Sequence, residues 1–304
     1  MIKDVPSRED FDNVGSALLN QAWQDLVGLQ LAVVEASDWA DDLDLAEYWR
    51  SATTKLATTL ALAHQAAEFF LKGRIVEVSP YLLVANSPKD WPKEDEAGDT
   101  SFSKFRTVDA QDLPRLHDRV ASHKMSPSFL VLLEKLRASR NAIMHTVAKD
   151  LEVKVAELVR SILEIHRNLV GGDWVSFRRD ALHGAGTTHL YSSDWVDPQL
   201  VREFLVAKEM LTNAEIESYF KIPAKARHYL CPYCTWSTMI DSSEEVRSAA
   251  LQPNTPESSL VHCPLCRKEH AVLRSDCGVD GCLGNVISEE WEKCLTCGEA
   301  HSFS

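Results

Sequence analysis

Eight cysteines are the residues of this 304-residue chain whose spacing most directly indicates chemistry. All of them lie in the last quarter of the sequence, where they form the pairs C-x2-C at 231–234, 263–266 and 294–297, and C-x4-C at 277–282. Two thiolates two residues apart bind one tetrahedral ion from a tight turn, and two such pairs supply the four sulfurs that Zn(II) prefers. The ligands expected for two structural zinc ions are Cys231, Cys234, Cys263, Cys266, Cys277, Cys282, Cys294 and Cys297.

The spacing leaves the pairing of these cysteines open. Sequential pairing gives two successive zinc ribbons, whereas a cross-braced pairing joins the first pair with the third and the second with the fourth. Either way, four thiolates close the coordination sphere, so the zinc ions are expected to be structural, and neither His262 nor His270 needs to be a ligand. The segment is acidic and has few aromatic residues, which favours a protein partner or a structural role over direct binding of nucleic acid.

A second candidate for chemistry is the stretch SRNAIMH, residues 139–145, in which His145 follows Arg140 by five positions. The spacing alone is weak evidence, because Arg178 and His183 repeat it. Arg140 lies at the edge of the apolar stripe of an expected helix. Arg178 opens a glycine-rich segment without a helical pattern, and we therefore expect it at the surface.

Helix geometry restricts how the stretch could act. On an ideal helix Asn141 and His145 share a face, but Arg140 and His145 diverge by roughly 140°. Both groups can meet one phosphate only if the helix breaks near Arg140 or if a second copy of the chain completes the site. A guanidinium beside an apolar stripe also needs a partner, for which Glu68 on an earlier helix is the candidate.

The elements that must position these groups are mainly helices. Apolar residues recur at helical spacing, and 85–105 is a polar, charged loop. No stretch before residue 170 alternates clearly enough to predict a strand. Helices are expected at 11–37, 45–75, within DAQDLPRLHDRVA, and at 127–147, 149–170 and 197–220.

The chain is expected to have three parts. They are a helical bundle over 1–170, a linker and additional helical segment over 171–227, and a tandem four-cysteine zinc-ribbon module, small and β-rich, over 228–304.

Composition places the chain among soluble globular proteins, with 45% hydrophobic and 25% charged residues. No run approaches the ~18 apolar residues of a membrane span, and MIKDVPSREDFD has neither the apolar core nor the cleavage pattern of a signal peptide. We therefore expect no membrane partner and a cytoplasmic protein, whose reduced thiols bind metal rather than form disulfides. A net charge of −13 repels nucleic acid at long range, so RNA would have to bind at a local basic surface.

Residues 10–170 resemble a HEPN domain, a helical superfamily of ribonucleases, toxins and nucleotide-binding proteins. The resemblance depends on AHQAAEFFLKG at 63–73 and on Arg140-Asn141-x3-His145, and it covers about half of the chain. It implies a mainly α fold, a HEPN-like helical bundle, and RNA cleavage that requires no metal, at a site shared by two protomers of a homodimer.

The resemblance also implies roles for the motif residues. His145 exchanges protons with the ribose 2′-OH or the leaving oxygen, Arg140 neutralises charge on the phosphate, and Asn141 orients His145 or binds phosphate. His64, one turn before Glu68, is expected to be structural. Proteins of this kind are often toxins or anti-phage defence effectors, which implies an antitoxin or trigger protein as partner. The alternative is a non-catalytic HEPN-like interaction module whose zinc tail binds a partner or nucleic acid.

Overall fold

The structure is a computed structural model that describes residues 1–37, 44–145, 154–184, 193–237 and 245–301. The chain divides into two compact units, Met1–Gly171 and Gly172–Ser304. Helices dominate, and a small antiparallel sheet carries the cysteines of the second unit, so the expected mainly α fold with a small β-rich module is confirmed.

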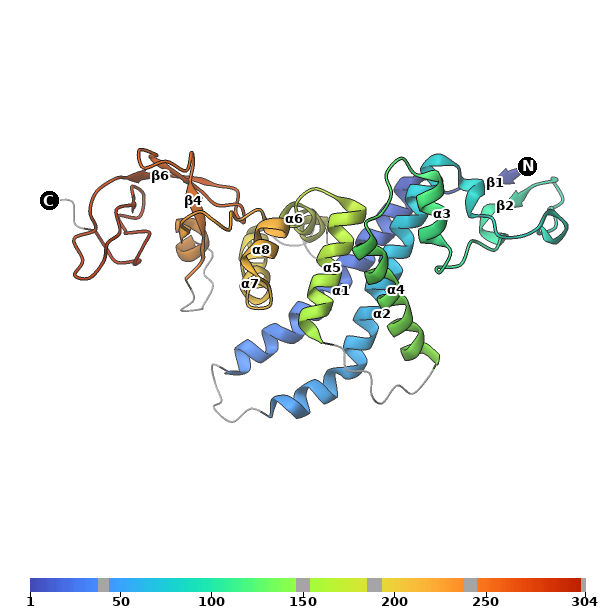
Figure 1. The fold of residues 1–304 in the computed structure, drawn as a ribbon, viewed down its shortest axis with the longest axis horizontal. Helices are drawn as coiled ribbons and strands as arrows, with labels where there is room; N and C mark the ends of the chain where they lie inside the picture. The colour runs from blue at the N-terminus through green and yellow to red at the C-terminus, as the bar shows by residue number, and fades with distance from the viewer. Residues whose placement is uncertain (38–43, 146–153, 185–192, 238–244, 302–304) are drawn as a thin grey trace. The chain divides into compact units, whose positions relative to one another are not determined.

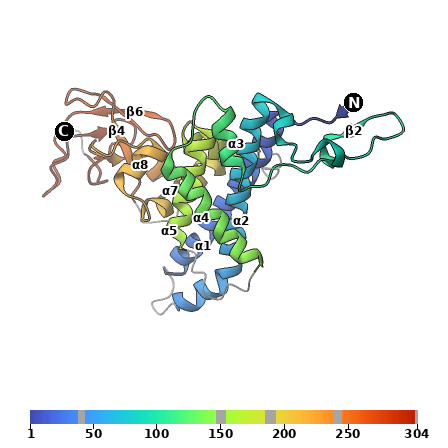
Figure 2. The same cartoon turned by 45° about the vertical axis from the view of Figure 1, so that its right-hand side comes forward.

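The first unit is a bundle of α-helices in which α1, α2, α4 and α5 lie side by side (Figures 1 and 2). Its α-helices are α1 Arg8–Ser37, α2 Leu45–Val78, α3 Leu113–Val120, α4 Pro127–His145 and α5 Val155–Ile165. Shorter helical turns are η1 Pro80–Leu83, η2 Pro88–Asp90, η3 Phe102–Lys104 and the π-helical η4 His166–Val170.

Close packing of α1 against α2 forms the centre of this bundle. Leu19 and Trp23 of α1 and Ala63 and Phe70 of α2 are all at most 1% exposed. Gly15 permits the close approach, because a Cβ at this position would lie 2.9 Å from Cε1 of Phe70. At its start, α2 is capped by the Asp44 carboxylate, which accepts a hydrogen bond from the backbone N–H of the third helical residue.

One feature of the first unit differs from the sequence prediction. Two short strands, β1 Ile2–Lys3 and β2 Thr100–Ser101, pair in parallel, and Lys3 forms an ion pair with Asp99 beside them. Strands of two residues are too short to show an alternating pattern, so the prediction of no strand before residue 170 was wrong for these four residues.

The second unit combines helices with a five-stranded antiparallel sheet of order β3-β4-β5-β6-β7. The helices are α6 Trp174–Gly184, η5 Ser193–Trp195, α7 Val196–Lys208, α8 Asn213–Phe220 and the π-helical η6 Tyr233–Ser237. The strands are β3 Tyr229–Leu230, β4 Arg247–Leu251, β5 Leu260–His262, β6 Glu269–Leu273 and β7 Ile287–Ser288.

The expectation that the segment after residue 171 is irregular, with Arg178 at the surface, was wrong. Residues Trp174–Gly184 form α6, and Arg178 is 2% exposed. Its guanidinium donates from Nε and Nη2 to the two carboxylate oxygens of Glu203 on α7, at 2.9 Å each. The same face of the helix buries Trp174 together with Val175, Arg178 and Leu182, which follow it by one, four and eight residues, a helical pattern that the nearby glycines obscured.

The helices of the second unit are joined to its cysteine-bearing part by polar contacts. Arg179 of α6 forms an ion pair with Asp197 of α7 and donates a hydrogen bond of 2.7 Å to the backbone carbonyl of Leu265, between two cysteines. The carboxylate of Asp173 lies 3.7 Å from the guanidinium of Arg267, the residue that follows Cys266. These contacts make α6 and α7 part of one compact unit with the sheet.

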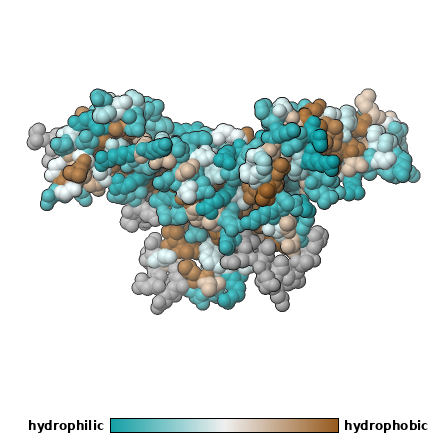
Figure 3. Space-filling view, in the orientation of Figure 1, coloured by the Kyte–Doolittle hydropathy of each residue, from teal (hydrophilic) through white to brown (hydrophobic). Residues whose placement is uncertain are grey.

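Hydrophilic residues cover most of the face drawn in Figure 3, in keeping with the charge of the chain. Among the described residues, no helix combines the length and the apolar character that crossing a membrane requires.

Candidate functional site

The eight cysteines gather into two groups of four. Within each group the sulfur atoms lie within 4.8 Å of one another. The structure therefore has the sequential pairing rather than the cross-braced one. The first group is Cys231, Cys234, Cys263 and Cys266, and the second is Cys277, Cys282, Cys294 and Cys297.

Sulfur separations in both groups fit a tetrahedral metal ion. The distance from Cys231 Sγ to Cys266 Sγ is 3.6 Å, and that from Cys234 Sγ to Cys263 Sγ is 3.8 Å. In the second group, Cys277 to Cys297 measures 3.6 Å and Cys282 to Cys294 measures 4.0 Å. A tetrahedron of sulfurs ~2.3 Å from a central metal has edges of ~3.8 Å, whereas a disulfide needs ~2.05 Å. Each group can thus bind one metal ion.

Donors around the sulfurs also suit thiolate ligands. In the first group, the backbone N–H of Cys234 donates to Cys231 Sγ at 3.4 Å, and the Ser248 hydroxyl lies 3.1 Å from Cys263 Sγ. Nε2 of His270, a buried residue, lies 3.7 Å from Cys231 Sγ, outside the group of four. Such outer contacts orient metal ligands and stabilise their negative charge.

The second group has equivalent backbone donors. The N–H groups of Gly284 and Thr296 donate to Cys282 Sγ and Cys294 Sγ at 3.3 and 3.4 Å. A Cβ at Gly284 would lie 2.6 Å from Cβ of Thr296 and 2.8 Å from Cys294 Sγ. Only glycine therefore allows the backbone to approach the ligands so closely.

Electrostatics favours a cation in these groups. Crowding by neighbouring thiols, first by Cys231, together with burial raises the pKa of Cys234 well above its usual value. A dication stabilises thiolates and reverses this effect, so four converging thiols are better suited to a metal than to the free state.

The motif residues lie at the end of α4, which is a continuous helix from Pro127 to His145. Arg140 Nη1 donates a hydrogen bond of 3.1 Å to the side-chain oxygen of Asn141, and both residues are half-buried. His145 is the last residue of the helix, and its side chain lies outside the described residues. The structure thus brings Arg140 and Asn141 together.

Glu68 lies beside His64 rather than at the guanidinium of Arg140. Oε1 of Glu68 is 3.2 Å from Nδ1 of His64, one turn away on α2. The expected Arg140–Glu68 ion pair is not among the contacts of the described residues. The positive charge of Arg140 nevertheless acts on both side chains through space: it adds to the lowering of the His64 pKa that burial causes, and it opposes the rise of the Glu68 pKa that burial causes.

Burial controls the protonation of this pair. The side chain of His64 is 7% exposed, and desolvation, then the charges of Arg140 and Arg137, lower its pKa to about 4. Desolvation also raises the pKa of Glu68. At neutral pH, His64 is therefore a neutral imidazole beside the half-buried carboxyl group of Glu68. Its spacing of four residues from Glu68 was visible in the sequence, but its proximity to Arg140 depends on how α2 packs against α4.

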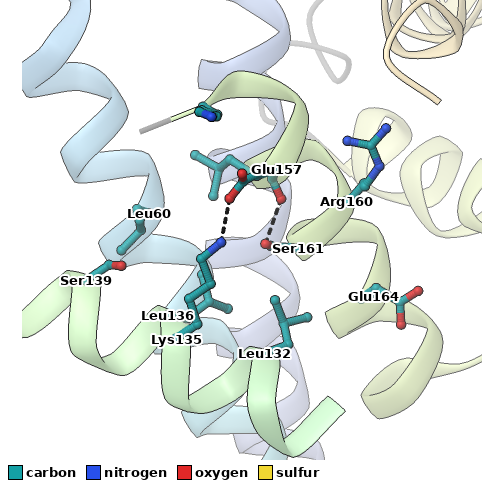
Figure 4. A pocket seen from close by; sticks show the side chains of 11 residues that line it. Leu60, Leu132, Lys135, Leu136, Ser139, Glu157, Arg160, Ser161 and Glu164 are labelled. Atoms are coloured by element: carbon teal, nitrogen blue, oxygen red, sulfur yellow. Dashed lines mark hydrogen bonds and ion pairs between the residues drawn. The ribbon is translucent and has the colours of Figure 1, made fainter. Parts of the chain in front are cut away.

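A separate cavity of about 260 Å³ lies between α2, α4 and α5 (Figure 4). Leu60, Leu132 and Leu136 line it, and Lys135 Nζ lies 2.5 Å from a carboxylate oxygen of Glu157 across it. Both partners of this ion pair are more than half exposed. The surface of this cavity is mainly apolar.

In comparisons with known proteins, no family model matches the chain, and no curated protein or solved structure matches it either.

Proposed function

We propose that the chain is a HEPN-type endoribonuclease that cleaves RNA without a catalytic metal. The observation that carries the proposal is the contact between Arg140 and Asn141 on α4, beside His64 and Glu68 on α2. A guanidinium whose geometry is fixed by a neighbouring amide can bind the non-bridging oxygens of a phosphate.

The proposed reaction is attack of a ribose 2′-OH on the adjacent phosphorus. The P–O5′ bond breaks, which leaves a 2′,3′-cyclic phosphate and a 5′-OH. His145 exchanges the proton of the 2′-OH or of the leaving oxygen. Arg140 neutralises the charge that builds up on phosphorus, and Asn141 holds phosphate or orients His145. Glu68 supports the site through its contact with His64.

The continuity of α4 supports a site formed by two chains. The helix does not break near Arg140, so an ideal helix directs Arg140 and His145 roughly 140° apart. In a homodimer, His145 of one chain can act at a phosphate held by Arg140 and Asn141 of the other.

In this proposal the cysteine groups bind two structural Zn(II) ions and take no part in the chemistry. Four sulfurs leave no open coordination position for water. The second unit would then recognise a trigger, an antitoxin or the RNA itself, in keeping with a toxin or antiviral defence effector.

The test is cleavage of total RNA and tRNA by the purified protein, with and without EDTA, beside His145→Ala and Arg140→Ala variants. Cleavage that survives EDTA and is lost in both variants is the expected result. Because chelation can unfold a zinc-dependent unit, a fragment that ends at Gly171, the boundary of the first unit, is assayed in parallel.

Equal activity in wild type and variants would refute the proposal. RNA binding without cleavage by any form would favour the non-catalytic interaction module. Light scattering of Arg140→Ala checks that the dimer persists.

A further inference from the structure

A cavity of about 270 Å³ lies between α2, α3 and α4, next to the motif. We refer to it as the α2–α3–α4 cavity. Apolar side chains, among them Leu71, Leu130 and Leu133, form part of its wall. The polar residues that line it are His64, Glu68, Gln111, Arg115, Asp118, Glu134 and Arg137.

The α2 side of the cavity carries hydrogen-bonding groups that a ligand could use. Nδ1 of His64 faces Glu68 at 3.2 Å. Among the described residues, the recorded polar contact of the His64 ring is made by Nδ1, and Nε2 is the nitrogen that a ligand could use. Since burial keeps the imidazole neutral, it can either donate or accept a hydrogen bond. Glu68 adds a carboxyl group on this side, and Gln111, just before α3, adds an amide group.

Two guanidinium groups lie on the α3 and α4 sides. Arg137 donates to both carboxylate oxygens of Glu134, at 2.9 and 2.6 Å, which fixes the plane of its guanidinium. Arg115 is exposed at the mouth of the cavity. Planar guanidinium groups stack on heterocyclic bases, whose edges are recognised by hydrogen bonds.

Charge indicates which part of a nucleotide this cavity would accept. Glu68, Asp118 and Glu134 place carboxylates around it against two guanidinium groups, while His64 is neutral. This balance does not favour a phosphate inside. A neutral heterocycle with a polar edge suits the same lining, and the volume lies just under the ~300–1,000 Å³ of ordinary small-molecule sites.

The position of the cavity relative to the motif supports this reading. Asn141 follows Arg137 by four residues and Arg140 follows it by three, so both motif residues lie one turn beyond the cavity wall on α4. The charge of Arg140 reaches His64 inside the cavity. A phosphate held at Arg140 would therefore lie next to a base in the cavity.

We propose that the α2–α3–α4 cavity binds one base of the RNA substrate beside the cleaved phosphate, with His64, Glu68 and Gln111 at the base edge and Arg115 and Arg137 at its faces. The inference builds on the proposed ribonuclease function and assigns the origin of base preference at that site.

Binding is tested on the full-length protein by calorimetric titration with AMP, GMP, CMP and UMP. Ribose 5-phosphate and inorganic phosphate, which have no base, are the control ligands. At least one nucleotide is expected to bind tenfold or more tightly than ribose 5-phosphate. Ala110→Trp, at the cavity wall outside a helix, should weaken that binding at least tenfold.

A second variant keeps the test valid if Ala110→Trp fails to fold. Arg115→Ala removes a proposed stacking group and should weaken the nucleotide about three- to tenfold. Arg119→Ala removes the same charge from the same helix, does not line the cavity, and should bind like wild type. Equal binding of ribose 5-phosphate and the nucleotides, or equal losses in the two arginine variants, would overturn the assignment.

Cleavage separates this inference from the proposed function. Nucleotide binding that Ala110→Trp abolishes, in a protein that cuts no RNA, supports the cavity and refutes the ribonuclease. RNA cleavage with the same base preference in wild type, Ala110→Trp and Arg115→Ala supports the ribonuclease and refutes the cavity.

Discussion

The buried ion pair between Arg178 and Glu203 gives a quantitative prediction about the second unit. Both side chains are 3% exposed, and Gln199 donates a further hydrogen bond of 3.1 Å to the Glu203 carboxylate. Replacing Glu203 by leucine leaves the Arg178 guanidinium buried without its counter-charge. Removing one partner of such a pair costs about 3–5 kcal/mol of unfolding free energy.

This cost translates into a large change in melting temperature. The second unit has about 130 residues, and an unfolding entropy of ~2 cal/mol/K per residue gives ~0.3 kcal/mol/K. Glu203→Leu should therefore melt roughly 10–18 °C below wild type. In the double variant Arg178→Met/Glu203→Leu no charge remains buried, and most of this loss should be recovered.

The assay is calorimetric melting of the metal-loaded protein, with Glu245→Gln as the matched control. Glu245 pairs with Arg247 in the same unit, but these side chains are 47% and 39% exposed, so breaking the pair should cost at most about 1 kcal/mol. The reasoning would be refuted if Glu203→Leu shifted the melting temperature no more than Glu245→Gln. It would also be refuted if the double variant were as unstable as the single one.

Two further predictions concern the cysteine groups and His64. The purified protein should carry two zinc ions per chain by elemental analysis, and Cys263→Ser should lose only the ion of its own group; loss of both ions would contradict two independent sites. The pKa of His64 is about 4, below its ordinary value of 6.5, so the unfolded chain binds the proton more readily. The free energy of unfolding should have its full value above pH 6.5 and should fall by roughly 3 kcal/mol as the pH drops from 6.5 through 4. His64→Gln should flatten this part of the profile in urea unfolding, and an unchanged profile would contradict the assignment.

Local patterns predicted the long helices and the metal-binding cysteines well. The apolar spacing before Val78 and the C-x2-C pairs are signals contained within one segment. Which cysteine pairs combine was not predictable, because that depends on how β3 to β7 pair across long separations in the sequence.

Contacts between segments account for what the sequence did not reveal. The burial of Arg178 depends on Glu203, 25 residues later, and no pattern within WVSFRRDALHG identifies that partner. Glu68 is a different case: charge alone suggested Arg140 as its partner, although its contact with His64 is a local one, four residues apart on α2, that the sequence already contained. The partner of Arg178 is thus determined by how α6 packs against α7, and a single segment does not encode that packing.

The hydrogen bond from Arg179 to the carbonyl of Leu265 spans 86 residues of sequence. At a synthesis rate of ~5–20 residues per second, Leu265, the acceptor of this hydrogen bond, is therefore made several seconds after Arg179 of α6. Because Leu265 lies between Cys263 and Cys266, we expect a metal ion bound by the first cysteine group to help position this acceptor. The first unit, Met1–Gly171, is compact by itself, so we expect it to fold while the rest of the chain is still being made. We therefore expect maturation of the second unit, but not of the first, to depend on metal supply.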